Sequence, residues 1–181
     1  MSYVAMLGDH TTPIGDLMTW VIKADGMSDI LSDDPKHAIE TPDELRFLDA
    51  QDQIYMQVVE ELTKGRKHTH WMWFIFFPQV AGLGRSAMAQ HYAIRDLDQA
   101  RRYLADSILG PRLREVVRLM MSHKTKSALE ILGSPDDLKF RSCLTLFRQA
   151  ASEESDRALL TDAFDQFYRG EADGRTLELL G

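Results

Sequence analysis

The sequence predicts an all-α protein, with a single compact domain of about seven to eight helices at residues 41–181 and an N-terminal appendage at residues 1–40. Three observations favour this fold class. Apolar residues recur at the spacing of a helix face along most of the chain. Residues that cap helices stand before these stretches, and Gly follows several of them. No neighbouring segments alternate with period two, as paired strands would.

The composition excludes several classes of protein. The 181 residues are 44% hydrophobic and 27% charged, enough to bury a core without disulfides. A net charge of −7 argues against bulk binding to nucleic acid or an anionic membrane, since both need a positive face. The single cysteine, Cys143, fits a reducing compartment. The negative charge leads us to expect no nucleic-acid partner and no membrane partner. The sequence has neither a signal-peptide pattern nor the ~20 apolar residues of a membrane span, so we expect a cytoplasmic protein.

The appendage contains one expected helix and a linker. Thr12 and Pro13 suit the start of a helix, and apolar residues then follow at helical spacing: Ile14, Leu17, Met18, Val21 and Ile22. Gly26 ends this helix, and an Asp-rich stretch at residues 28–40 is typical of a linker. The helix either docks on the main domain or binds a protein partner, whose identity the sequence leaves unknown.

The main domain begins with a predicted helix from Thr41 to Gly65. Thr41-Pro42-Asp43-Glu44 has the pattern of a capping box, an apolar stripe follows, and Gly65 supplies the stop. The next apolar run, residues 71–77, suits either a buried strand or a buried helix. Because a strand would lack a partner, we favour a helix that begins near Thr69 and ends before Pro78.

Capping residues mark the remaining helices. Ser86 is the expected start of a helix at residues 87–94, and Asp96 with Gln99 is the expected start of one at residues 97–105. Pro111 is expected at the first position of the next helix, and Ser127 with Glu130 begins a short helix that ends at Gly133. Ser134-Pro135 begins a further helix, whose Leu138, Leu144 and Phe147 are expected to face inward. A last long helix ends at Gly170, and residues 176–180 add a turn.

The segment Gly82-Leu83-Gly84-Arg85-Ser86 is a glycine turn that leads into a helix. Free backbone N–H groups at a helix start hold phosphate or carboxylate, and Arg85 would add a charged fork, so Arg85 and Ser86 are candidate ligand contacts. It lacks the Lys of a P-loop and the preceding strand of a dinucleotide fingerprint. The alternative is that the glycines only make a tight turn and Ser86 only caps the helix.

The segment before the apolar run combines cations with indole rings. Arg66, His70 and Trp71 are candidate ligand contacts, because an indole next to basic groups stacks a base or a nicotinamide ring. An aromatic stripe at helical spacing is more often core. His68 and His70 share a face only on a strand, and no other metal-ligand spacing is present, so we expect no metal and no cofactor.

Two acidic residues at a helix start form a second candidate. Asp136 and Asp137 stand where the helix dipole keeps carboxylates ionised, and either would serve as a catalytic base. The alternative is an ordinary capped helix with a pair between Asp137 and Arg141.

Several stretches together resemble a known family. They are Gly65-Arg66-Lys67, residues 69–74, Phe77-Pro78-Gln79, Gly82-Leu83-Gly84, Tyr92-Ala93-Ile94, residues 109–114 and residues 133–139. These stretches resemble the bacterial domain-of-unknown-function family 1810, over about residues 42–181. The resemblance implies a helical fold without an agreed activity. The family has sometimes carried a calpastatin label, but no inhibitory repeat is present here. Two phenylalanines precede Pro78 where the family pattern has one.

A fainter similarity is to the NADAR domains, helical proteins that act on ADP-ribose-linked N-glycosides. It rests on the order of a histidine-tyrosine helix (His91, Tyr92), a leucine-glycine helix and a Ser-Pro-Asp turn at Ser134. Their late Trp-Gly motif is missing. The glycine turn at a helix start, with cations and tryptophans close in sequence in an acidic protein, leads us to expect a helical domain that binds or acts on a small anionic, nucleotide-derived molecule. The alternative is a non-enzymatic protein-interaction module.

Overall fold

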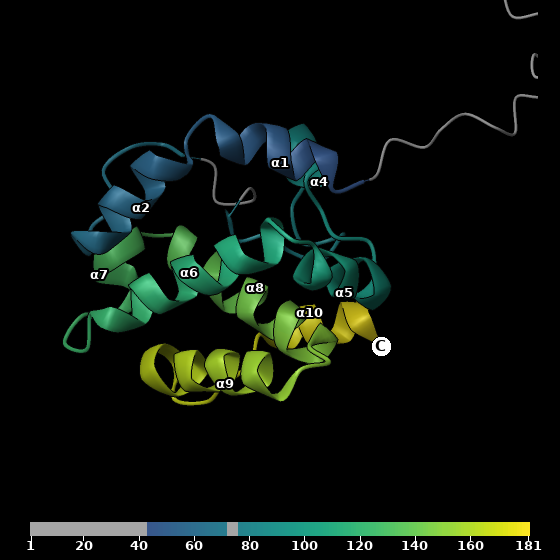
Figure 1. Ribbon diagram of the computed structural model, residues 1–181. Helices are drawn as coiled ribbons and strands as arrows, with labels where there is room; N and C mark the ends of the chain where they lie inside the picture. Colours follow the sequence, from purple (N-terminus) through teal and green to yellow (C-terminus); the bar gives the residue numbers. More distant parts are fainter. Residues whose placement is uncertain (1–42, 72–75) are drawn as a thin grey trace, which may run out of the picture. The chain divides into compact units, whose positions relative to one another are not determined.

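The computed structural model describes residues 43–71 and 76–181, and these ranges contain nine helices (Figure 1). Their bounds are α1 Leu45–Asp52, α2 Tyr55–Thr63, α4 Ala87–His91, α5 Leu97–Ala105, α6 Leu109–Ser122, α7 Ala128–Leu132, α8 Asp136–Ala150, α9 Glu154–Tyr168 and α10 Gly174–Leu180. In these ranges the β-structure consists of one isolated parallel bridge, between Val80 and Ile94. The predicted all-α class is confirmed. The helix predicted at residues 14–22 lies outside the described residues.

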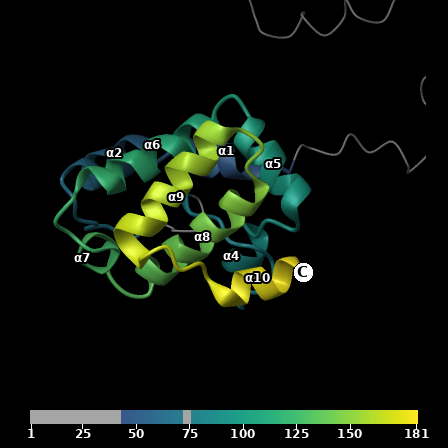
Figure 2. The same cartoon turned by 90° about the horizontal axis from the view of Figure 1, so that it is seen from below.

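Helix α8 forms the centre of the core. It packs against α5, α7, α9 and α10, and both views show it enclosed by these helices (Figures 1 and 2). Phe140, Leu144 and Phe147 of α8 are fully buried. Burial of each such side chain stabilises the fold by roughly 1.5–3 kcal/mol. Leu138 of the same helix, predicted to face inward, is 57% exposed, so its prediction is wrong.

Three predicted helix starts have the expected side-chain caps. Ser86 accepts a hydrogen bond from the backbone N–H of Ala89, and Asp96 accepts one from that of Gln99. Ser127 and Glu130 form a complete capping box, in which each side chain bonds the other residue's backbone N–H. Such caps satisfy N–H groups that a helix cannot pair internally, which is why local sequence alone locates them.

The helix predicted from Thr41 to Gly65 is divided in two. Helix α1 ends at Asp52 and α2 begins at Tyr55, after Ile54 leaves the helical conformation. A contact between residues far apart in sequence lies next to the break. There the buried amide of Gln51 donates a hydrogen bond to the Tyr103 hydroxyl at 2.9 Å. The predicted capping box is wrong for α1, whose first residue follows Glu44 without a side-chain cap.

Two further helix starts differ from their predictions. Helix α6 begins at Leu109, so Pro111 lies within its first turn instead of at its first position. The Asp106 side chain accepts hydrogen bonds from the N–H groups of Ile108 and Leu109 at that start. Residues 69–71 are not helical, so the helix predicted from Thr69 does not begin there, and residues 72–75 lie outside the described residues.

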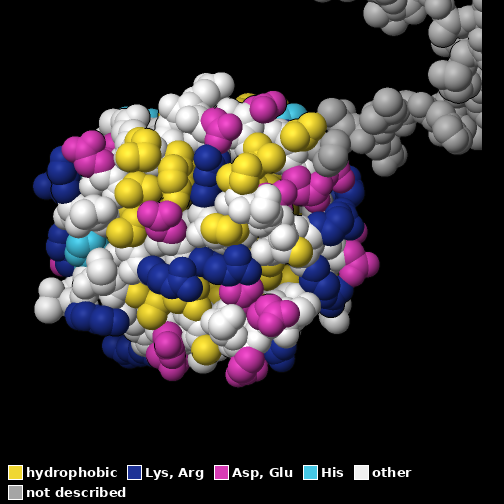
Figure 3. Space-filling view, in the orientation of Figure 1, with side chains coloured by type: hydrophobic (Ala, Val, Ile, Leu, Met, Phe, Trp, Pro, Cys, Tyr) yellow, Lys and Arg dark blue, Asp and Glu magenta, His cyan; other side chains and the backbone are white. Residues whose placement is uncertain are grey.

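The face seen in Figure 3 mixes charges of both signs with apolar side chains. It therefore offers no continuous basic surface of the kind that binds a phosphate backbone. Among the helices that the structure describes, none has the length and apolar character needed to cross a membrane.

Candidate functional site

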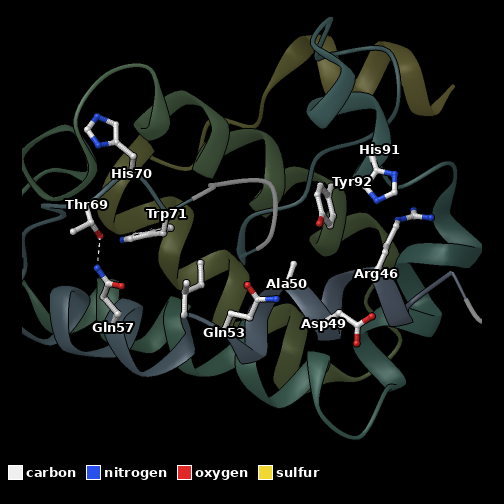
Figure 4. Close-up of a pocket in the computed structure, with 11 residues that line it drawn as sticks. Arg46, Asp49, Ala50, Gln53, Gln57, Thr69, His70, Trp71, His91 and Tyr92 are labelled. Atoms are coloured by element: carbon white, nitrogen blue, oxygen red, sulfur yellow. Dashed lines mark hydrogen bonds between the residues drawn. The ribbon is translucent and has the colours of Figure 1, made fainter.

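A cleft of about 680 Å³ lies between the α1–α2 pair, the segment at residues 69–71 and the end of α4. Its size is that of a small-molecule site. Eleven residues line it: Arg46, Asp49, Ala50, Gln53, Ile54, Gln57, Thr69, His70, Trp71, His91 and Tyr92. Figure 4 shows that α1 and α2 supply one long wall, with residues 69–71 opposite one end and α4 opposite the other.

The α1–α2 wall presents four polar side chains in a row. Arg46, Asp49, Gln53 and Gln57 follow one another along the cleft (Figure 4). Arg46 and Asp49 share one face of α1, and Gln53 and Gln57 continue the row across the break at Ile54 (Figure 4). Asp49, Gln53 and Gln57 are exposed. The row therefore runs from the half-buried guanidinium of Arg46 through the exposed carboxylate of Asp49 to the two exposed amides.

The opposite wall at the Gln57 end is fixed by the buried carboxylate of Glu61. It accepts hydrogen bonds from the backbone N–H of His68 at 2.9 Å, the N–H and hydroxyl of Thr69, and the indole Nε1 of Trp71 at 2.8 Å. Gln57 adds a hydrogen bond to the Thr69 hydroxyl at 2.8 Å. One side chain of α2 thus determines the path of residues 68–71.

The hydrogen bonds keep Glu61 ionised. Burial alone would raise its pKa, but the donors of Thr69, His68 and Trp71 outweigh burial and lower the pKa to about 2. A carboxylate that accepts several such bonds holds its neighbours in one arrangement, because each bond is charge-assisted. These bonds therefore favour one arrangement of residues 68–71 at this end of the cleft.

Trp71 is held on its ring face as well as at its nitrogen. The Lys67 ammonium lies 4.4 Å from the centre of the Trp71 ring, and Phe76 meets the ring edge-on. Lys67 also pairs with Asp136, which accepts a second hydrogen bond from Lys139 at 2.9 Å. Burial opposes ionisation of Asp136, but the two lysines outweigh it and lower its pKa.

The other end of the cleft contains Arg46 and His91. The Arg46 guanidinium donates to Asp43 at 3.2 Å and to the carbonyl of Ala93 at 3.1 Å. Asp43 also pairs with Arg95, and this hydrogen bond is the largest cause that holds the pKa of Asp43 below its ordinary value. The exposed His91 ring lies edge-on to Tyr92, with 4.7 Å between ring centres.

The structure brings two of the predicted site residues together, since His70 and Trp71 both line the cleft. The other five lie outside its lining. Arg66 is exposed, and Asp136 reaches the cleft only through Lys67 and Trp71. Asp137 has one buried carboxylate oxygen without a hydrogen-bond partner in the part of the chain described. None of these observations tests ligand contact or catalysis, so both roles stay predictions.

The glycine turn is packed by apolar side chains. A Cβ at Gly82 would lie 3.2 Å from the Leu179 side chain, and one at Gly84 would overlap the Cβ of Ala89. Ser86 uses its hydroxyl to cap α4, which has only five residues. These contacts account for the glycines without a ligand, and anion binding at Arg85 and Ser86 stays a prediction.

Sequence reasoning missed most of the cleft. The sequence could have predicted the polar row of the α1–α2 wall, because polar residues three and four positions apart line one face of a predicted helix: Arg46, Asp49, Gln53 and Gln57. His91 and Tyr92 were noted in the family motifs but not as site residues. Glu61 had no signal, since a glutamate late in a helix is ordinarily a solvated surface group. In the described ranges, no three His, Cys, Asp or Glu side chains gather into a metal site.

Comparisons with known proteins identify the fold and the family of the chain. No curated protein matches the chain. It is similar to a crystal structure of the conserved hypothetical protein Rv1873 from Mycobacterium tuberculosis, with 44% identity and a TM-score of 0.71, over 76% of this chain and 96% of that chain. A family model described as "Protein of unknown function (DUF1810)" matches residues 42–180. The chain therefore belongs to the DUF1810 family.

Proposed function

We propose that the cleft binds a small anionic molecule derived from a nucleotide. The observation that carries the proposal is the composition of its lining, in which a guanidinium, a carboxylate, two imidazoles and two amides accompany the apolar and aromatic side chains of Ala50, Ile54, Trp71 and Tyr92. Ligand sites combine an apolar lining with a few polar groups that fix orientation. The Glu61 hydrogen bonds reduce the ordering that binding requires, which favours affinity.

The cleft suits a small molecule better than a macromolecule. Its polar groups converge from three segments on one volume of about 680 Å³. A planar ring would pack on Ile54 and Tyr92 in the apolar part of the lining, and an anionic group would lie toward Arg46 and His91. The catalytic role proposed for Asp136 or Asp137 would require a ligand that extends beyond this lining.

A thermal-shift screen of the full chain against nucleotides, NAD and ADP-ribose tests the proposal. A ligand at 100 times its dissociation constant should stabilise the protein by ~2.7 kcal/mol. His91→Ala should abolish the shift. The matched control is His68→Ala, because the His68 ring is also exposed but does not line the cleft.

Three outcomes decide between the sites. A shift lost in His91→Ala and kept in His68→Ala supports the cleft. A shift lost in Arg85→Ala but kept in His91→Ala moves the ligand to the glycine turn. The absence of any shift across the whole panel rejects nucleotide binding.

A further inference from the structure

Asp136, at the start of helix α8, belongs to a series of contacts that ends at the wall of the cleft. Its carboxylate pairs with the Lys67 ammonium, and that ammonium lies 4.4 Å from the centre of the Trp71 ring. The indole nitrogen of Trp71 in turn donates a hydrogen bond to Glu61 at 2.8 Å. Asp136 and Lys67 are 69 positions apart, so the fold, and not the local sequence, connects α8 to the cleft.

Lys67 can hold the Trp71 ring because it is itself held in place. Only 11% of its side chain is exposed, and its backbone N–H donates to the carbonyl of Ile131 at 2.7 Å. A cation over the face of an indole attracts the ring, and the attraction strengthens where water is excluded. Trp71 is therefore fixed at its nitrogen by Glu61 and on its ring face by Lys67.

The place of Lys67 depends on the negative charge of Asp136. The Lys139 ammonium also bonds Asp136, at 2.9 Å, so one carboxylate lies between two cations. Without that charge, the two ammonium groups would repel each other and the largely buried Lys67 would lose its ion pair. Lys67 would then turn toward water and leave the face of the Trp71 ring.

His70 is the cleft residue whose place depends on these contacts. Its exposed ring lines the cleft between Thr69 and Trp71 (Figure 4). In the described part of the chain, no hydrogen bond to His70 itself is found. Its two neighbours are fixed instead, Thr69 by Glu61 and Trp71 by both Glu61 and Lys67. The direction of the His70 ring therefore follows from the position of Trp71.

We propose that Asp136 is a positioning residue of the cleft, which acts through Lys67 and the Trp71 ring to place His70 for a ligand. Its effect on ligand binding rests on the proposed function, whereas its effect on Trp71 requires no ligand. A positioning residue, unlike a catalytic base, needs no contact with the bound molecule. This role therefore fits the place of Asp136 outside the cleft lining.

Nuclear magnetic resonance of the full chain tests the position of Trp71. The signal of its indole N–H, assigned through the backbone, should shift and exchange faster with solvent in Asp136→Asn, because the ring loses the Lys67 contact. Lys67→Met should give the same change, and both substitutions together should give no more than either alone, since they remove one contact. Asp136→Glu keeps the carboxylate and should keep the signal near its wild-type position.

Asp162→Asn is the matched control, because it makes the same exchange at an exposed position of α9 and should leave the indole signal unchanged. Backbone amide signals of the other helices report whether each variant is folded. If Asp136→Asn does not fold, Asp136→Asn with Lys139→Met decides, because the repulsion between the lysines is gone while the carboxylate is still missing. An unchanged indole signal in a folded variant without the Asp136 carboxylate overturns the positioning role.

Isothermal titration calorimetry with ADP-ribose and NAD as probes connects this position to binding. Asp136→Asn should weaken the binding of either probe about threefold or more, and Asp136→Glu should retain most of the affinity. Wild-type affinity in a variant whose Trp71 signal has shifted overturns the effect on the ligand. Wild-type protein that binds neither these probes nor any molecule of the thermal-shift screen rejects the proposed function, and the indole signal still decides whether Asp136 places Trp71.

Discussion

The carboxylate of Glu61 accepts a hydrogen bond from the indole nitrogen of Trp71 at 2.8 Å, and this contact joins helix α2 to the opposite wall of the cleft. Ten positions separate the two residues, and the chain between them turns back on α2. Because Glu61 and Trp71 are both buried, the bond is shielded from competing water. The shape of one end of the cleft therefore depends on a residue that does not line it.

Replacement of Glu61 by Gln should destabilise the protein by about 2–4 kcal/mol. Gln retains one acceptor oxygen but presents an NH₂ group to donors that need an acceptor, so at least one buried donor loses its partner. Urea unfolding measures the effect. Glu60→Gln is the control, since the Glu60 side chain is 66% exposed and pairs with Lys64 on the surface. Equal stability of the two variants would contradict the positioning role of Glu61.

The stability that Glu61 contributes should disappear in acid. Its folded-state pKa of about 2 lies below the ordinary value of 4.5, so the folded state favours the ionised form. The contribution is complete above the ordinary pKa and is lost as the pH falls through the folded value. The difference in unfolding free energy between wild type and Glu61→Gln should therefore shrink from about pH 5 to about pH 2. A difference that stays constant over this range would reject the assignment.

The ion pair between the half-buried Arg114 and the buried Asp156 connects α6 to α9 and gives a prediction about the fold. Arg114 Nε and Nη2 donate to the two Asp156 oxygens at 2.6 and 2.7 Å, and Nη2 also reaches the carbonyl of Leu104. Asp156→Asn should cost about 2–3 kcal/mol, because the guanidinium keeps its charge and loses its partner. Thermal unfolding compares it with Asp162→Asn, an exposed change on the same helix. Equal melting temperatures would show that solvent replaces the pair.

The helices were predictable where their signals are local. Ser127 and Glu130 cap α7 as expected, since the capping box depends on residues three positions apart. The break between α1 and α2 was not predictable, because it accompanies the bond between Gln51 and Tyr103, which lie 52 positions apart. Leu138 shows the same limit, since periodicity identifies a face but not which end of the helix the rest of the chain covers.

The candidate site was only partly predictable for a related reason. His70 and Trp71 were found because polar and aromatic residues are dense in their segment. Glu61 was missed because its burial depends on residues 68–71 folding back over α2, which no local pattern encodes. The proposed site at Arg85 was inferred from glycine spacing, and such spacing does not distinguish a ligand loop from a turn that packs closely against its own helix.

The domain boundary predicts that residues 41–181 fold without the appendage. Every side chain that lines the cleft belongs to residues 46–92, and the core of the described residues lies wholly within residues 47–164. Deletion of residues 1–40 should leave the melting temperature within about 2 °C of the full chain, since the core of the described residues would stay intact. Circular dichroism measures both helicity and unfolding. A molten or aggregated product would place part of the core in the appendage.

The contact between Gly84 and Ala89 predicts a specific coupling. A Cβ at Gly84 would overlap the Cβ of Ala89, so Gly84→Ala should force the turn and α4 apart and destabilise the protein by about 1–3 kcal/mol. Gly174→Ala is the control, because nothing lies within 4 Å of a Cβ there. Ala89→Gly removes the overlapping atom at a helical cost of about 1 kcal/mol.

A double-mutant cycle by urea unfolding isolates this coupling. The Gly84→Ala, Ala89→Gly pair should be more stable than the sum of the single effects, by roughly 1–2 kcal/mol, because the overlap is absent when either methyl group is missing. Strict additivity would mean that the turn relaxes around the new methyl group. In that case Gly84 is not needed for packing against α4, and close packing would not account for the glycine at this position.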